Sequence, residues 1–226
     1  MEAGAALLAE KPTSSSARMH RHLNGGGRVS DLATVDPTVF VGENARITGN
    51  ACVRDHVVLE DYSEIGGSAD VSGNVLLKGE SAIDGWARID GHVVLSDRAH
   101  ATGYALITDH AQMSGSSLAS GNCEIRGRVQ LRENAHVAGS CKLSADVIVT
   151  DEAFCGGSSK GSGNAVIGGS VYMVGNSWVF ANAKILGAGV LGGDVWVAGD
   201  TILEGSYSYA GSMVLREAAP TEPNKP

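Results

Sequence analysis

The chain repeats every six residues from Ala45 onward without a slip. Its hexads read ARITGN over residues 45–50, ACVRDH over 51–56 and VVLEDY over 57–62. The third place is aliphatic almost throughout, the first is small, and the fifth is Gly or Asp. A strict short period of this kind indicates a solenoid. The same frame divides residues 27–218 into 32 hexads with no insertion.

A second period of eighteen residues lies on top of the first. Every third hexad begins mostly with valine, at Val39, Val57, Val75, Val93, Ala111, Val129 and Val147. The hexads that follow these begin with smaller residues, at Ala45, Ser63, Ser81, Ala99, Ser117, Ala135 and Ala153. Residues eighteen apart therefore share an environment, which predicts three hexads per coil and a triangular cross-section.

The predicted fold is all-β: a single-stranded parallel β-helix of about 10–11 coils. Coils pair at about 4.8 Å, so the rod would be roughly 50 Å long. The first and third places of each hexad should face the interior and exclude water, because side chains alternate along a strand. Gly or Asp at the fifth place suits a corner whose backbone shape resists large side chains.

Composition limits the function classes. The net charge of −8 and the pI of about 5.3 argue against a nucleic-acid partner. No run of 18 apolar residues predicts a membrane span. Residues 1–26 are expected to be a flexible lead-in without a secretory signal, 27–218 the β-helix, and 219–226 a disordered tail. The lead-in and the tail are candidates to cap the ends of the rod.

Four cysteines occur without a CxxC pair, so no structural zinc site is expected. Cys123 and Cys141 are eighteen residues apart and both face inward, so they should stack on adjacent coils. Their expected separation of about 4.8 Å allows a disulfide, although two small buried hydrophobes fit equally simple packing. The pattern favours a reducing, cytoplasmic compartment.

The [aliphatic]-x-[Gly/Asp]-x-[small]-x repeat resembles that of the hexapeptide-repeat proteins. The resemblance covers about 85% of the chain and implies a left-handed parallel β-helix. Many members of that family are trimeric acyltransferases that use coenzyme A or acyl carrier protein and a catalytic His between subunits. Members with uninterrupted repeats include putative transferases of undemonstrated chemistry. In this chain no loop interrupts the coils, and no His falls in a motif that aligns with a catalytic one.

Outward positions on the valine face are unexpectedly apolar. Seven of the ten second-place residues there form one line, namely Phe40, Val58, Leu76, Val94, Ile148, Val166 and Ile202. A strand face open to water should be polar, so a stripe of this length indicates that something covers it. A second copy of the chain and the N-terminal segment are the two candidates, and β-propensity alone is the plain explanation.

Aromatic residues gather outside the last four coils. Phe154 and Tyr172 align on one face, and Trp178, Phe180 and Trp196 on another. Aromatic side chains are favoured anchors at interfaces. The C-terminal half is therefore a predicted docking surface for another protein, with a glycan platform as the alternative.

His92 and His110 occupy the same corner on adjacent coils, and they are the best enzymatic candidates. Either could serve as a general base near neutral pH. A metal site would need a third ligand, for which only Asp109 or Asp90 could be proposed. Solvated corner histidines remain the plain interpretation.

The leading hypothesis is a rigid, self-associating scaffold without a cofactor, most simply a homotrimer. The first alternative is a trimeric acyltransferase that uses coenzyme A and His110 or His92. The second alternative is a rod that recognises a glycan or a protein.

Overall fold

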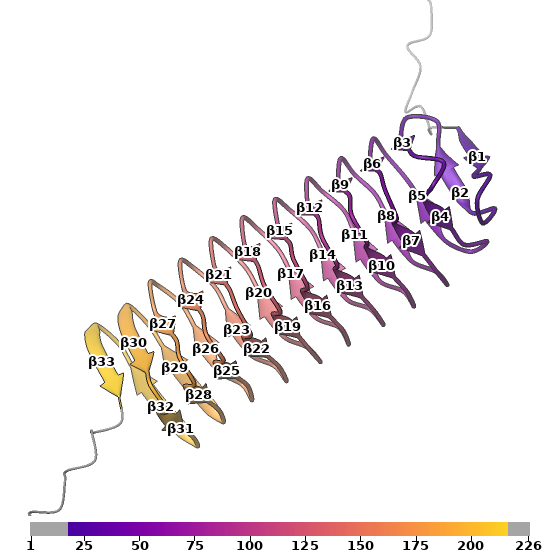
Figure 1. Cartoon of the computed structure of the whole chain (residues 1–226). Coiled ribbons are helices and arrows are strands. Elements are labelled where there is room, and N and C mark those ends of the chain that lie inside the picture. Colours follow the sequence, from indigo (N-terminus) through magenta and orange to yellow (C-terminus); the bar gives the residue numbers. More distant parts are fainter. Residues whose placement is uncertain (1–17, 217–226) are drawn as a thin grey trace, which may run out of the picture.

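The computed structural model describes residues 18–216 and confirms the predicted fold class. The chain forms a straight β-solenoid of about ten coils, and no helix occurs within residues 18–216 (Figure 1). The left-handed winding that the resemblance implies stays a prediction.

Three sheets run along the three sides of the rod. Sheet A contains β1 (Met19–Arg21), β2 (Arg28–Ser30), β5 (Arg46–Ile47), β8 (Glu64–Ile65), β11 (Ala82–Ile83), β14 (His100–Ala101), β17 (Leu118–Ala119), β20 (His136–Val137), β23 (Phe154–Cys155), β26 (Tyr172–Met173), β29 (Ala188–Leu191) and β32 (Ser206–Tyr209). Sheet B contains β3 (Thr34–Val35), β6 (Cys52–Val53), β9 (Asp70–Val71), β12 (Arg88–Ile89), β15 (Leu106–Ile107), β18 (Glu124–Ile125), β21 (Lys142–Leu143), β24 (Lys160–Gly161), β27 (Trp178–Val179), β30 (Asp194–Ala198) and β33 (Ser212–Arg216). Sheet C contains β4 (Phe40–Val41), β7 (Val58–Leu59), β10 (Leu76–Leu77), β13 (Val94–Leu95), β16 (Gln112–Met113), β19 (Gln130–Leu131), β22 (Ile148–Val149), β25 (Val166–Ile167), β28 (Lys184–Ile185) and β31 (Ile202–Leu203).

The register confirms the eighteen-residue coil. In sheet C, Leu76 lies between Val58 on one side and Val94 on the other, and all three strands are parallel. The neighbouring inward residue, Leu77, is fully buried. Aliphatic side chains from all three sheets therefore form ladders that fill the interior along the rod.

The corners between sheets carry the backbone shape that the sequence pattern predicts. Nearly all are Gly or Asp with positive φ, for example Gly103 at +71° and Asp97 at +61°. A residue with a Cβ adopts this conformation only at a cost, which Asp lowers by forming a local hydrogen bond.

The corner aspartates also join adjacent coils. The carboxylate of Asp97 accepts a hydrogen bond from the backbone N–H of Gly115, one coil later, at 3.0 Å. The same Asp-to-Gly bond recurs four times at distances of 2.7–3.0 Å, at Asp55–Gly73, Asp61–Gly79, Asp109–Gly127 and Asp151–Gly169. These carboxylates cap corner N–H groups that point away from the strand ladders, a role the turn chemistry alone does not reveal.

Replacing Asp97 by Ala should lower the free energy of unfolding by about 1–2 kcal/mol, through the lost hydrogen bond and the strained φ. The N–H of Gly115 also lowers the pKa of the Asp97 carboxyl. A lowered native pKa means that this stabilisation is present above the unfolded pKa of about 3.9 and is lost as the pH falls through the native value. Urea unfolding from pH 7 to pH 3 tests this, with Asp97→Asn as the control that keeps the shape and loses the titration. An advantage of the wild type over Asp97→Asn that did not shrink toward pH 3 would contradict it.

The N-terminal end of the rod differs from the expected flexible lead-in. Residues 19–21 form strand β1, which pairs antiparallel with β2. The next residues cross the end of the coil, where the N–H of Val41 donates to the C=O of Asn24 at 2.9 Å. The His22 ring is 9% exposed, and its Nε2 lies 3.0 Å from the C=O of Val39. Residues 18–26 therefore cap this end, while the rest of the predicted lead-in and the 219–226 tail lie outside the described residues.

The C-terminal end is open in the described structure. Each sheet stops there, at β31, β32 and β33 (Figure 1). The inward residues of this last coil are only partly buried, namely Leu203, Tyr207, Tyr209, Met213 and Leu215. Their counterparts one coil earlier are fully buried, so the interior of the rod is exposed to solvent at this end.

Candidate functional site: the outward surfaces of the rod

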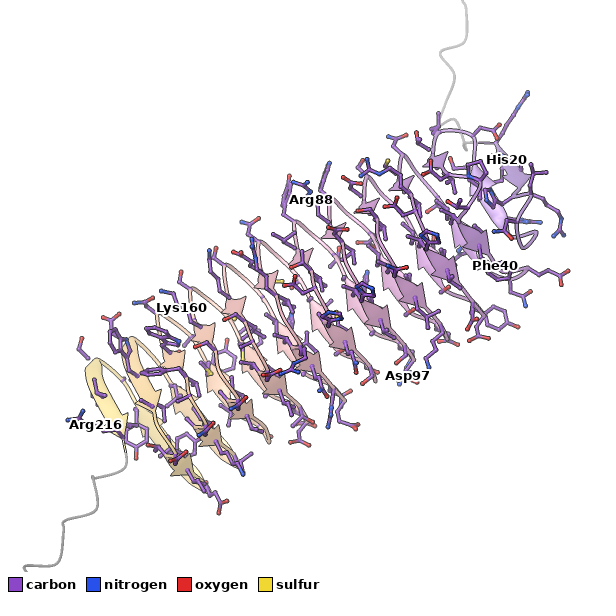
Figure 2. All side chains as sticks on the ribbon, viewed as in Figure 1. His20, Phe40, Arg88, Asp97, Lys160 and Arg216 are labelled. Atoms are coloured by element: carbon purple, nitrogen blue, oxygen red, sulfur yellow. The ribbon has the colours of Figure 1, made fainter. Side chains whose placement is uncertain are left out.

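The apolar stripe predicted on the valine face lies on the outer surface of sheet C. Phe40, Val58, Leu76 and Val94 follow one another in direct strand register. Phe40 is 36% exposed, and Figure 2 shows it near the N-terminal end. The stripe continues with Ile148, Val166 and Ile202, interrupted by Gln112, Gln130 and Lys184. The outward orientation is confirmed, and the role of these side chains as an interface stays a prediction.

Two aromatic rings lie flat on sheet A near the C-terminal half. Phe154 stacks on Tyr172 with centroids 4.5 Å apart and planes within 12°. His136 meets the edge of Phe154 at 5.1 Å. Glycine at position 156 leaves room for the Phe154 ring, since a Cβ there would overlap it. The rings form a smooth platform, with Tyr172 46% exposed.

A second aromatic group lies on sheet B. Trp178 packs against Phe180 at 4.7 Å and against Trp196 at 5.5 Å, while the Lys160 ammonium lies 5.8 Å from the Trp178 ring. Beside it is a mostly apolar groove of about 330 Å³, lined by Asn176, Asp194, Trp196, Ser212, Met213 and Val214. The predicted aromatics on this face are therefore together, and their suggested partner, a protein or a glycan, stays a prediction.

The two candidate catalytic histidines are adjacent, as predicted. The rings of His92 and His110 stack with centroids 5.0 Å apart, and His92 Nε2 lies 3.3 Å from the Asn74 amide nitrogen. The carboxylate of Asp109, which was a possible third ligand, instead accepts the N–H of Gly127. The geometry provides an imidazole pair on an exposed corner without a carboxylate that orients either ring.

The same coils carry a shallow polar hollow on sheet B, between the histidine corner and a stacked Trp86–Tyr104 pair at 5.3 Å. The hollow has a volume of about 180 Å³ and includes Arg88, whose side chain is labelled in Figure 2. Nearby, Arg54 is paired with Asp70 at 2.6 Å. Such a surface could hold a small anion at Arg88, but it lacks the enclosed shape of most small-molecule sites.

Sequence reasoning missed two polar pairs on sheet A. The Nε2 atom of His100 lies 3.2 Å from the Asp84 carboxylate, and His136 Nε2 lies 3.1 Å from Ser120 Oγ. Burial lowers the pKa of His136, which keeps its ring neutral at pH 7. Both pairs join residues sixteen apart, the fourth place of one hexad and the second place one coil later. That spacing was available in the sequence and would have found them.

All four cysteines are free. Cys123 and Cys141 are buried on adjacent coils, and burial raises the pKa of the Cys123 thiol to about 12. Contact with Cys141, together with burial, also raises the pKa of Cys155. These thiols are packing residues without nucleophilic character.

Within residues 18–216 no three His, Cys, Asp or Glu side chains are grouped so that they could hold a metal ion. No helix in the described part of the chain is long and apolar enough to cross a membrane. Comparison with models of known protein families and with curated proteins gives no match for this chain. The functional argument therefore depends on the outer surfaces themselves.

Proposed function

We propose that the protein is a rigid rod that associates side by side with copies of itself through the apolar stripe on sheet C. The observation that carries this proposal is the in-register line of Phe40, Val58, Leu76 and Val94 on an outer strand face. Apolar side chains in this arrangement gain free energy when a partner removes them from water. The uninterrupted coils keep the stripe straight, so it can match an equally straight partner.

A trimer is the expected assembly, with the stripes of three rods facing a common axis. Closed symmetry of this kind covers each stripe and leaves no copy of it exposed. The assembly would serve as a structural or interaction scaffold in the cytoplasm, with sheets A and B turned outward. The aromatic groups on those sheets would then be available to another protein.

The test is a charge placed in the stripe. Leu76→Asp should raise the dissociation constant of the assembly at least about 100-fold, because it buries an unpaired carboxylate at the contact. The matched control is Ala82→Asp, at the equivalent outward place on sheet A in the next hexad. Size-exclusion chromatography with light scattering measures both. A wild-type chain that stays monomeric across concentrations would overturn the proposal.

Coenzyme A-dependent acyl transfer is the second candidate, favoured by the His92–His110 stack. One of these rings would act as the general base for an acceptor hydroxyl or amine. Titration calorimetry with coenzyme A tests this, followed by His92→Ala and His110→Ala. Absence of binding, or variants that lose nothing, would overturn it.

A further inference from the structure

The open C-terminal end of the rod binds a partner that the structure itself specifies. We infer that it is the same end of a second copy, which gives a tail-to-tail dimer. This contact is separate from the sheet C stripe and does not depend on the proposed function. It follows from the hydrogen-bonding direction of the last coil, the slope of its strands and the residues that would face one another.

Backbone groups of the last coil point at the open end. In each coil the N–H groups of outward residues donate to the next coil, as Lys184 does to Thr201 at 2.9 Å and Leu186 to Leu203 at 2.8 Å. The corresponding N–H groups of Ile202 and Glu204 have no later coil to meet within residues 18–216. In parallel pairing the C=O of such a residue faces the same way as its N–H. The last coil therefore presents an edge of alternating donors and acceptors.

The slope of the coil favours a two-fold contact. The chain climbs about 4.8 Å in eighteen residues, so β31 is the lowest strand at the open end, β32 is intermediate and β33 is the highest. A two-fold axis through β32, perpendicular to the rod, inverts this slope in the second copy. The highest strand of each copy then faces the lowest strand of the other, and all three gaps are equal. Every facing pair is antiparallel.

Corners and side-chain direction fix the register. Corner must face corner, Gly205 against Gly211, and inward residues must face inward residues. Both conditions hold when the axis passes beside Ser208, so that facing residues lie equally far before and after it. The resulting pairs are Ser208 with Ser208, Tyr207 with Tyr209, Glu204 with Ser212, Leu203 with Met213, Ile202 with Val214, Thr201 with Leu215, and Asp200 with Arg216.

The chemistry of these pairs is complementary. Ile202 and Val214 are 55% and 57% exposed in the single chain and would cover each other. Asp200 and Arg216 carry opposite charges, and the two-fold axis uses this pair twice. Figure 2 shows Arg216 at the very end of the rod. The hydroxyl of Tyr207 is buried without a hydrogen-bond partner in the described structure, and Tyr209 of the second copy would face it.

The N-terminal end explains why the contact closes. Strand β1 covers the edge of β2, and residues 22–27 cover β4, so head-to-tail stacking into a fibre is blocked there. An open end that matches only itself gives a dimer and stops.

Cysteine cross-linking tests the register. Facing Ser208 residues should have Cα atoms about 5.5 Å apart, within the range of a disulfide. Ser208→Cys, in a full-length chain that also carries Cys52→Ser and Leu76→Asp, should give a covalent dimer under mild oxidation. Ser206→Cys is the matched control, because its two copies would lie about 13 Å apart along the strands. Equal cross-linking at both positions, or none at 208, would overturn the proposal, and the second result would assign the end to residues 217–226 or to nothing.

Charge exchange gives an independent readout. In the Leu76→Asp background, Arg216→Asp and Asp200→Arg should each weaken the dimer about 10-fold or more, and the double variant should return to within about 3-fold. Sedimentation equilibrium measures the dissociation constants. Single variants without effect, or a double variant that stays as weak as the singles, would overturn the contact. Failure of the sheet C stripe would leave these results unchanged.

Discussion

Leu77→Ala is expected to lower the free energy of unfolding by about 3 kcal/mol, within the range of about 2–5 kcal/mol seen for buried leucines. Leu77 is fully buried in the interior ladder of sheet C, between Leu59 and Leu95. A coil only two strand residues wide on each side cannot collapse into the cavity, so the lost contacts are not recovered. Urea unfolding followed by circular dichroism measures the change.

Leu76 is the matched control, since it has the same side chain on the same strand but points outward. Leu76→Ala should change the stability of the single rod by less than about 1 kcal/mol, measured below the concentration at which rods associate. It should instead weaken assembly. Equal losses at the two positions would contradict the alternation on which the inside and outside of this molecule depend.

Gly103→Ala is expected to cost about 3 kcal/mol. Gly103 has φ +71°, and a Cβ there would lie 2.8 Å from the backbone nitrogen of Gly121. The unfavourable φ contributes about 1 kcal/mol, and the backbone that must move contributes about 1–3 kcal/mol. Thermal and urea unfolding of the purified variant measure the sum.

Gly211→Ala separates the two causes. Gly211 belongs to the same corner ladder and has φ +86°, but nothing lies within 4 Å of its Cβ direction. Only the backbone preference should therefore be lost, at about 1 kcal/mol. If Gly211→Ala were as destabilising as Gly103→Ala, close stacking of the corners would not be what selects glycine.

Much of the fold could be predicted because its contacts repeat at a fixed spacing. A period of six places Leu77 inside and Leu76 outside, and a period of eighteen places Leu76 beside Val58 and Val94. No knowledge of distant contacts was needed, since every coil touches only the coils next to it. The stacking of His92 on His110 follows in the same way.

The features that were missed fall outside this spacing or combine it with side-chain length. Strand β1 is antiparallel and exposed on both faces, so it carries no hexad pattern. The His100–Asp84 pair requires a reach across to the preceding coil, sixteen residues back. The bonds from corner aspartates to the next coil depend on which carboxylate oxygen faces a free N–H, which residue type alone does not specify.

The assembly and the chemistry could not be fixed at the same level. An outward Val satisfies both strand preference and a buried contact, so Val58 and Val94 are equally consistent with a solvated face. The imidazoles of His92 and His110 have no attached carboxylate or pocket that would single out a reaction.

Because each strand of the middle coils has equivalent neighbours above and below, length and thickness are set independently in this molecule. Eighteen residues added or removed between two corners would change the reach of the rod by one step of about 4.8 Å and leave its girth untouched. The same step would move the groups on its three sides along the axis without turning them. A chain of this kind behaves as a ruler, in which the number of coils decides how far apart its two ends hold whatever they bind.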